Sequence, residues 1–332
     1  MKAVVYEQYG APEVLHMADI PKPTPKDNEI LVKVRAVTVG FGDLMARDFK
    51  HVTPRSFNMI FPFWLLSKFS FGLNAPKQRI LGAEYAGEVE AVGTAVTRFK
   101  VGDAVFGYRG INLGAYVEYL CVPADGLVEF KPANLTYEEA AAIPYGALTA
   151  LNLLRKVDIK RGNKVLINGA SGGIGAAALQ LAKHYGAQVT GVAGTARLDL
   201  LRALGADKVL DYTRDDFTQA GETYDVIFDI LGRSPFGRAK KALKPDGRML
   251  FASFKLKQLV QMLWTARRGG KRVICALSSE KPADLTLIKE LVEAGKIKAI
   301  IDRCYPFEEA AAAHRHAESG HKRGSIVLSV GA

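Results

Sequence analysis

The sequence predicts an α/β protein in which a doubly wound parallel sheet is combined with a β-rich region. Beyond Pro132, apolar strand-like segments alternate with helical ones at short spacing, a pattern typical of βαβ units. A glycine-rich turn joins the first such strand to its helix. Residues 1–125 instead carry short alternating segments punctuated by Gly and Pro. Two different architectures therefore share one chain.

The N-terminal region is expected to be all-β. Its apolar and polar residues alternate as in half-buried strands, and prolines between residues 21 and 25 mark a loop. The expected strands cover residues 1–6, 30–37, 84–92 and 103–107.

The rest of the chain is expected to alternate between strands and helices. The expected strands cover residues 164–168, 188–192, 209–210, 224–229, 248–252 and 272–277, with a last strand at 326–330. The expected helices cover residues 137–154, interrupted at Pro144, then 176–185, 198–204 and 283–294.

Composition limits the class of protein. The 332 residues are 48% hydrophobic and 24% charged, which suits two globular domains. Three isolated cysteines give no zinc or disulfide pattern, so a reducing, cytoplasmic compartment is expected. No signal peptide or transmembrane segment is expected.

The net charge of +11 is spread along the chain. A basic cluster at residues 267–272 could attract nucleic acid. No aromatic residues are interleaved with a basic motif, however, so a solvated surface is favoured and no nucleic-acid partner is expected.

The glycine-rich turn predicts dinucleotide binding. It follows an apolar strand and precedes an amphipathic helix, which is the context that the fingerprint requires. Small residues allow the backbone to approach a pyrophosphate, and the helix start attracts negative charge. The cofactor-binding residues expected here are Ala170, Ser171, Gly172, Gly173, Ile174 and Gly175.

The end of the second strand predicts NADP(H) rather than NAD(H). An NAD site usually carries an acidic residue there, which binds the ribose 2′-hydroxyl. Residues 192–197 contain no acid, so nothing in that stretch repels a 2′-phosphate. Thr195 can donate a hydrogen bond and Arg197 can supply charge. The alternative is that Arg197 is a solvated residue of the first helical turn.

The order of motifs resembles the zinc-independent, quinone oxidoreductase-like branch of the medium-chain dehydrogenase/reductase superfamily. The matching segments are residues 81–93, 99–107, 114–118, 146–150, the glycine turn, 295–297 and 320–324. The resemblance implies a GroES-like β-barrel catalytic domain from residues 1–127 and 281–332. It also implies a central Rossmann NADP-binding domain at residues 128–280, a cleft between the domains, and usually a homodimer.

The motifs that hold zinc in related dehydrogenases are altered. The resemblance places a ligand Cys shortly before Asp43, where this chain has none, and a His at Ala83. The four-cysteine structural lobe is also missing. Zinc requires three or four N, S or O ligands, so no zinc is expected.

Without zinc to lower the pKa of an alcohol, the favoured reaction is hydride transfer from NADPH to a quinone or an α,β-unsaturated carbonyl. One alternative is a zinc-free alcohol or aldehyde oxidoreductase. The other is a non-enzymatic, NADPH-binding membrane-associated or structural protein.

Two residues are candidates for catalysis. Asp43 matches the family's loop aspartate and would orient the loop or relay a proton, unless it only caps a turn. Tyr85 would donate a proton, unless it is a packing residue of a strand. Relatives often carry Asn and Pro where this chain has Gly40 and Phe41, so Phe41 is expected to shape the substrate pocket.

Further cofactor contacts are expected beyond the glycine turn. Some follow from the resemblance and others from positions at the carboxyl ends of strands, where open α/β sheets bind ligands. A solvated side chain is the favoured alternative for Lys322. These residues are Thr149, Tyr212, Gly232, Ser253, Cys275, Ala276 and Lys322.

Residues 57–71 are unusually rich in aromatic and aliphatic side chains. One hypothesis is a mobile lid over a hydrophobic substrate, with Phe61 and Trp64 in the pocket. The alternatives are a hydrophobic cluster packed on the barrel or a peripheral membrane contact.

Overall fold

The computed structural model describes residues 1–331, which separate into two compact units. One contains residues 1–53, residues 65–145 and the chain from Lys281 onward. The other contains residues 54–64 and 146–280. The second boundary lies after Tyr145 rather than at residue 128, and the short segment 54–64 groups with the parallel-sheet unit.

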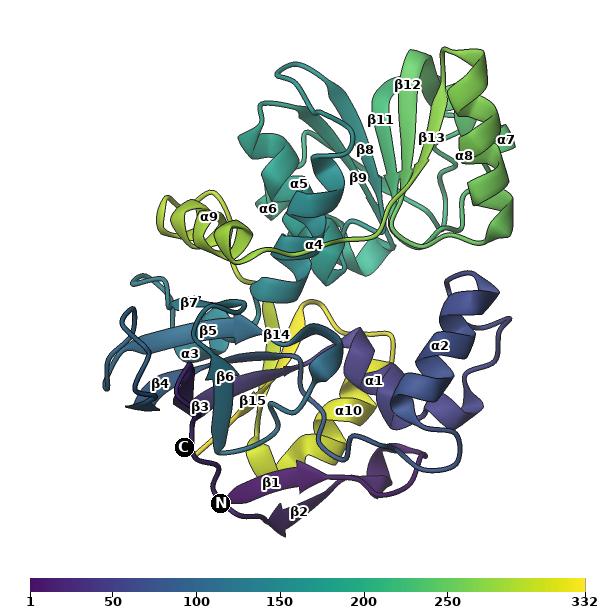
Figure 1. The fold of residues 1–332 in the computed structure, drawn as a ribbon. Coiled ribbons are helices and arrows are strands. Elements are labelled where there is room, and N and C mark those ends of the chain that lie inside the picture. The colour runs from purple at the N-terminus through teal and green to yellow at the C-terminus, as the bar shows by residue number, and fades with distance from the viewer. Residues whose placement is uncertain (332) are drawn as a thin grey trace. The chain divides into compact units, whose positions relative to one another are not determined.

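Both ends of the chain build the sheet of the β-rich unit (Figure 1). Strand β15 pairs antiparallel with β3, where Leu328 lies opposite Val37, and β6 also pairs with β3. The strand order is β14 (Ile301–Pro306), β15 (Ser325–Ser329), β3 (Glu29–Val39), β4 (Glu84–Val92), β5 (Ala104–Tyr108) and β7 (Val128–Phe130), with β6 (Tyr119–Pro123) beside this path. A separate hairpin contains β1 (Lys2–Val5) and β2 (His16–Asp19).

The expectation of an all-β N-terminal region is wrong, because helices interrupt it. Helix α1 (Phe41–Arg47) begins where Asp43 accepts the Gly40 N–H. Helix α2 (Phe61–Phe71) has Pro62 in its first turn, where proline is tolerated. Three other helices in this unit are α3 (Tyr137–Ala141), α9 (Pro282–Glu293) and α10 (Ala310–Glu318).

The second unit contains the predicted doubly wound parallel sheet (Figure 1). All five strand pairs are parallel, and the order reverses between β8 and β11. The strands in spatial order are β10 (Lys208–Asp211), β9 (Gln188–Ala193), β8 (Lys164–Asn168), β11 (Tyr224–Asp229), β12 (Leu243–Phe251) and β13 (Arg272–Cys275). Its helices are α4 (Pro144–Leu154), α5 (Gly173–His184), α6 (Leu198–Ala203), α7 (Phe236–Ala239) and α8 (Leu256–Arg268).

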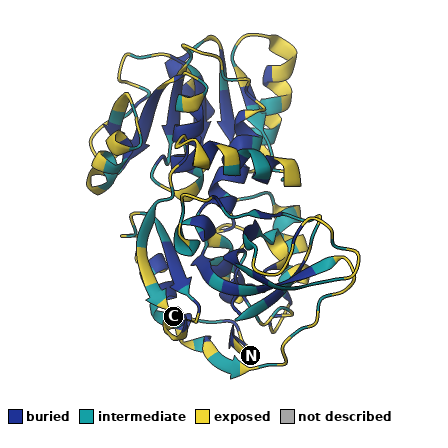
Figure 2. Cartoon of the chain, turned by 90° about the vertical axis from the view of Figure 1, so that its left-hand side faces the viewer, coloured by how far each residue is buried: buried dark blue, intermediate teal, exposed yellow. Residues whose placement is uncertain are grey.

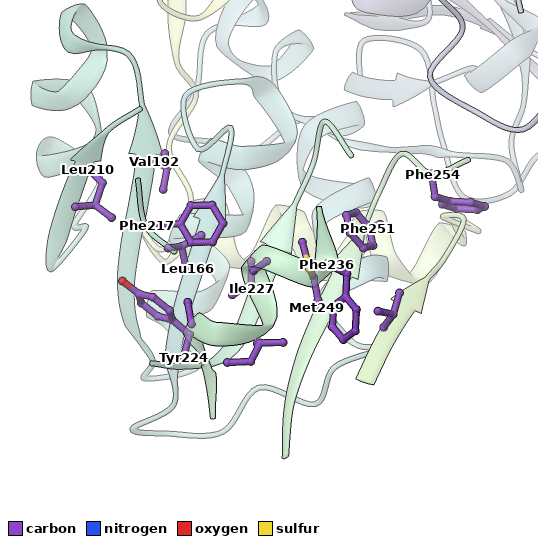
Figure 3. Packing of buried hydrophobic residues seen from close by; sticks show 14 residues of the cluster. Leu166, Val192, Leu210, Phe217, Tyr224, Ile227, Phe236, Met249, Phe251 and Phe254 are labelled. Carbon is purple, nitrogen blue, oxygen red and sulfur yellow. The ribbon is translucent and has the colours of Figure 1, made fainter. Parts of the chain in front are cut away.

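The strands of this parallel sheet are mostly buried (Figure 2), as expected for a sheet covered on both faces. One hydrophobic cluster fills the side of the sheet near α7 and α8 (Figure 3). Met59 and Ile60 pack against this cluster together with Leu259 and Met262 of α8. The apolar segment before α2 is thus anchored to the parallel-sheet unit.

A polar network lies inside the β-rich unit. Arg47 and His314 are almost completely buried. The Arg47 guanidinium donates to Nδ1 of His314 at 3.0 Å and also pairs with Glu318. His314 Nε2 therefore carries the proton and donates to the Tyr116 hydroxyl at 3.1 Å, and that hydroxyl donates to the Thr38 carbonyl. Burial, with Arg47 alongside, lowers the pKa of His314 to about 3.

We expect His314→Leu to lower the free energy of unfolding by about 3 kcal/mol at pH 8, because it leaves a buried guanidinium short of a partner. The depressed pKa makes the His314 contribution complete above its ordinary pKa of about 6.5. It is lost as the pH falls towards 3. Near pH 5 the wild type should already have lost about 2 kcal/mol of it.

Urea unfolding of both proteins at pH 8 and pH 5 would measure this gap, with His321→Leu as a control at an exposed histidine. A gap that is the same at both pH values would contradict a buried neutral His314.

Candidate cofactor and active site

The turn between β8 and α5 is held by backbone contacts. Gly169 has a φ of +90°, and the N–H groups of Gly169 and Ala170 both donate to the Val192 carbonyl of β9. A Cβ at Gly175 would lie 2.2 Å from the Gly169 carbonyl oxygen, so only glycine fits there. A Cβ at Gly173 would instead have no neighbour within 4 Å. The first turn of α5 thus presents open backbone, which is what a phosphate requires.

Helix α4 packs directly on this turn. A Cβ at Gly146 would lie 2.6 Å from the Gly173 carbonyl oxygen, so the two backbones are in close contact. The predicted cofactor residue Thr149 lies one turn further along α4 and is 8% exposed. The structure therefore places Thr149 close to the glycine turn in the parallel-sheet unit.

Asp229, which the sequence analysis did not single out, organises the loop after β11. Its buried carboxylate accepts the N–H groups of Leu231, Gly232 and Ser234 at 3.2, 3.1 and 2.6 Å. Burial raises its pKa, against the effect of these hydrogen bonds. An acidic residue that ends a strand and is followed by Gly232 is typical of such a turn, and this signal was present in the sequence.

The loops after β11 and β12 meet at this edge of the sheet. A Cβ at Gly232, whose φ is +65°, would lie 2.2 Å from the Ser253 carbonyl oxygen. A Cβ at Gly169 would lie 3.6 Å from the Leu231 side chain. Gly169, Gly232 and Ser253 are thus brought together where the strand order reverses, the place at which open α/β sheets bind ligands.

The end of β9 carries a feature that the sequence analysis missed. The Thr195 hydroxyl donates to the carboxylate of Asp211, which also accepts the N–H and hydroxyl of Thr213 at 3.0 and 2.7 Å. The Thr195 hydrogen bond, above all, lowers the pKa of Asp211. The absence of an acid therefore holds for residues 192–197 but not for the space around Thr195. Asp211 comes from the next strand and was not visible as a neighbour in sequence.

Two other predicted cofactor residues lie beside this feature. Tyr212 is 63% exposed, and a Cβ at Gly194 would lie 3.3 Å from its hydroxyl oxygen. Arg197 is half-buried at the end of a short 3₁₀ turn, Thr195–Arg197. The exposed ring and the guanidinium come from loops after β10 and β9.

Cys275 and Ala276 lie at the end of β13. The Cys275 side chain packs against the hydrophobic cluster of Figure 3, and burial raises the pKa of its thiol to about 12. The Ala276 N–H donates to the Phe251 carbonyl at 3.5 Å. Both residues lie beside the carboxyl end of β12, and Ser253 is the second residue after that strand.

Two buried carboxyl groups lie in the β-rich unit. Asp43, 1% exposed, accepts the N–H groups of Gly82 and Gly40 at 2.7 and 2.8 Å, and burial raises its pKa to about 6. Asp43 thus ties the start of α1 to the start of β4. Because both carboxylate oxygens accept backbone N–H groups, orienting the loop is favoured over relaying a proton as the role of Asp43.

Glu84, which the sequence analysis did not single out, is the second carboxyl group. It accepts the Thr38 hydroxyl at 2.5 Å and the Tyr145 N–H at 2.8 Å. Burial raises its pKa to about 7, although the charge of Lys322 acts in the opposite direction. Lys322 therefore belongs to the surroundings of Glu84 within this unit.

The other predicted residues of the active site differ in accessibility. Tyr85 is 1% exposed inside the β-rich unit, where a Cβ at Gly107 would lie 2.4 Å from its hydroxyl oxygen. This enclosure favours the alternative that Tyr85 is a packing residue of the strand, and its role as a proton donor stays a prediction. Phe41, at the first position of α1, is 59% exposed.

The apolar segment 57–71 is partly anchored and partly exposed. Phe57 is buried, whereas Phe61 is 57% exposed and stacks on Trp64 with ring centroids 5.6 Å apart. Helix α2 has no buried residue. Met59 and Ile60 before the helix pack in the parallel-sheet unit, whereas Phe71 at its end belongs to the β-rich unit, where its ring lies 4.9 Å from that of Phe49. A lid function remains a prediction.

Within residues 1–331 there is no group of three or more His, Cys, Asp or Glu side chains that could hold a metal. In the same part of the chain, every helix is too short or too polar to cross a membrane.

Comparisons with known proteins agree with this architecture. The model of the alcohol dehydrogenase GroES-like domain matches residues 26–132, and that of the zinc-binding dehydrogenase family matches residues 204–328. The quinone oxidoreductase of Sus scrofa is 31% identical over 98% of this chain and 95% of its own. The chloroplastic NADPH-dependent alkenal/one oxidoreductase of Arabidopsis thaliana is 30% identical over 99% of this chain and 79% of its own.

Solved structures show the same similarity. The quinone oxidoreductase from Coxiella burnetii has a TM-score of 0.83 and 29% identity, with 99% of both chains covered. An NAD-dependent alcohol dehydrogenase has a TM-score of 0.81 and 30% identity over the whole of both chains. With its GroES-like strands, its parallel sheet and relatives matched nearly end to end, the chain belongs to the medium-chain dehydrogenase/reductase superfamily and is an oxidoreductase.

Proposed function

We propose that this protein is an NADPH-dependent reductase that transfers hydride to quinones or α,β-unsaturated carbonyls without zinc. The observation that carries the proposal is the open first turn of α5 at Gly173, next to Thr149 of α4 and to the loops that contain Gly232 and Ser253. The relatives named as quinone and alkenal/one oxidoreductases support the choice of acceptor.

In this proposal, the chain binds and orients the cofactor, and NADPH supplies the hydride when bound. Backbone N–H groups at the start of α5 bind the pyrophosphate, and Asp229 fixes the loop that approaches the ribose. Arg197 and Tyr212 bind the 2′-phosphate end of the cofactor. The hydroxyl groups of Thr195 and Thr213 donate hydrogen bonds to the nearby Asp211 carboxylate. Asp43 positions the loop that carries Phe41, which shapes the acceptor site.

The absence of zinc remains part of the proposal and rests on side-chain chemistry. Asp43 and Glu84 are hard oxygen ligands already engaged by N–H and hydroxyl donors. Ala83 offers no ligand atom where zinc-dependent relatives are expected to have His. The cytoplasmic compartment and the homodimer likewise remain predictions, and several plant relatives are named as chloroplastic.

Two other functions are outcomes that experiment can separate. The alcohol dehydrogenase among the solved structures favours a zinc-free alcohol or aldehyde oxidoreductase as the second candidate. A binding protein without turnover is the third.

We expect Gly173→Val to weaken NADPH binding at least about ten-fold, because branched carbon atoms would fill the space in which the pyrophosphate lies. The fold should survive, since a Cβ there meets no protein atom. Fluorescence titration with NADPH measures the change, with Gly237→Val as control because that helical glycine is equally unobstructed. Unchanged affinity for NADPH would mean that the glycine turn does not contact the cofactor.

We expect NADPH oxidation with quinones and enones, no NADP⁺ reduction with primary alcohols, and no loss of rate after dialysis against a metal chelator. Activity with alcohols would select the second candidate. Tight NADPH binding without turnover of any acceptor would select the binding protein.

An effect of Trp64→Ala that grows with the chain length of the enone would support the lid hypothesis, and indifference to chain length would reject it.

We expect NADPH to bind more tightly than NADH, and Arg197→Gln to reduce this preference by about ten-fold through the loss of one charge-assisted contact to the 2′-phosphate. NADH binding should change little. Arg202→Gln on α6 is the matched control, because Arg202 is exposed and pairs locally with Asp199. Equal or tighter binding of NADH by the wild type would contradict the proposed choice of cofactor.

A further inference from the structure

Helix α8 has apolar residues on two adjoining faces, one turned inward and one outward. The inner face carries Leu259 and Met262, which pack against the hydrophobic cluster, and the buried Thr265. The Thr265 hydroxyl accepts the Val273 N–H at 3.0 Å, which fixes α8 against β13. One helix face is therefore fully used by the fold.

The outer face of α8 is exposed although it is apolar. Its members follow the spacing i, i+4, i+7 and i+8, which places them on one stripe of a helix. They are Leu256, Val260, Leu263 and Trp264, with exposed fractions of 69, 57, 59 and 49%. Single exposed apolar residues need no explanation, but an aligned set marks an interaction surface.

The residues around the stripe are basic. Lys255 and Lys257 lie at one end of α8, Arg267 and Arg268 at the other, and Arg268 stacks on Trp264 at 4.2 Å. Lys271 and Arg272 follow directly, and the sequence has no acidic residue between Asp246 and Glu280. The charge that complements this surface is negative.

A second apolar element adjoins the N-terminal end of α8 within the same unit. Lys255 Nζ donates to the Arg55 carbonyl at 2.8 Å, and Met59 and Ile60 share the cluster with Leu259 and Met262. The exposed Phe61 follows Ile60 in the chain. The segment 55–61 thus packs beside the N-terminal end of α8.

We propose that the outer face of α8 docks the protein on an anionic lipid surface. An interfacial helix combines a Leu- and Trp-rich face with flanking Lys and Arg residues, and tryptophan favours the boundary between lipid and water. A basic segment gains attraction from anionic headgroups. The helix lies along the membrane, and its outer side chains enter the headgroup region.

A second copy of the chain is the weaker occupant for this surface. A two-fold interface brings the same patch of both copies together. Such an interface would place the basic residues of one copy opposite the same residues of the other copy. The segment contains no acidic residue to neutralise them, and facing like charges oppose association. The proposal stands independently of the reaction proposed above, since it rests on α8 and its basic flanks.

The test is co-sedimentation of the full-length protein with vesicles of phosphatidylcholine, with and without phosphatidylglycerol. We expect binding to anionic vesicles only, and release at high salt because the headgroup attraction is screened. Arg267→Gln with Arg268→Gln should weaken partitioning about 25-fold, at roughly five-fold for each charge. Lys240→Gln with Lys241→Gln, an exposed pair in the same unit, is the control.

The apolar stripe needs its own variants. Leu263→Ser with Trp264→Ser should reduce vesicle binding at least about ten-fold, whereas Ile111→Ser, at an 82% exposed isoleucine, should have no effect. The chain has two tryptophans, so Trp64→Phe leaves Trp264 as the sole reporter. Its emission should shift to shorter wavelength when anionic vesicles are added.

Absence of binding, equal binding to neutral and anionic vesicles, or an unshifted Trp264 emission would overturn the proposal. So would a dimer that the stripe variants dissociate in sedimentation velocity, because the surface would then be an interface between copies. NADPH oxidation measured without vesicles reports on the proposed reaction separately.

Discussion

Close approach of backbone to backbone at the start of α5 is the constraint on which the parallel-sheet unit depends. Gly175 lies against the Gly169 carbonyl, and Gly146 of α4 lies against Gly173. Two helices and one strand therefore meet without side chains between them. The one glycine of this group that faces open space, Gly173, is the one at which a ligand can approach the backbone. Packing and binding are divided between neighbouring glycines of the same turn.

The strands of the parallel sheet and the glycine turn were predictable because both have local signals. Buried parallel strands appear as short apolar runs, and the turn has a fixed spacing between strand and helix. Helix α1 was missed because it is only two turns long, and helix α2 because its apolar run lacks a polar face. Helix α8 does carry a helical period, since four of its apolar residues follow the spacing i, i+4, i+7 and i+8, so this helix was predictable from the sequence.

Parts of the site could not be predicted, because they depend on contacts between distant segments. Asp211 reaches Thr195 only when β10 pairs with β9. The burial of Tyr85 follows from the pairing of β4 with β5, which places it opposite Gly107. Asp229 carried a local signal as a turn former, but its place beside the glycine turn depends on the order of strands in the sheet.

The exposed stripe of α8 bears on how such a protein would meet its substrate. An enzyme held at a bilayer encounters lipid-soluble molecules by diffusion in two dimensions, so its rate follows their mole fraction in the membrane rather than their concentration in the surrounding water. Dilution with inert lipid would then slow turnover even at constant total substrate. Helix α8, which packs on the edge strand β13, would in this way confine the encounter between enzyme and substrate to the plane of the membrane.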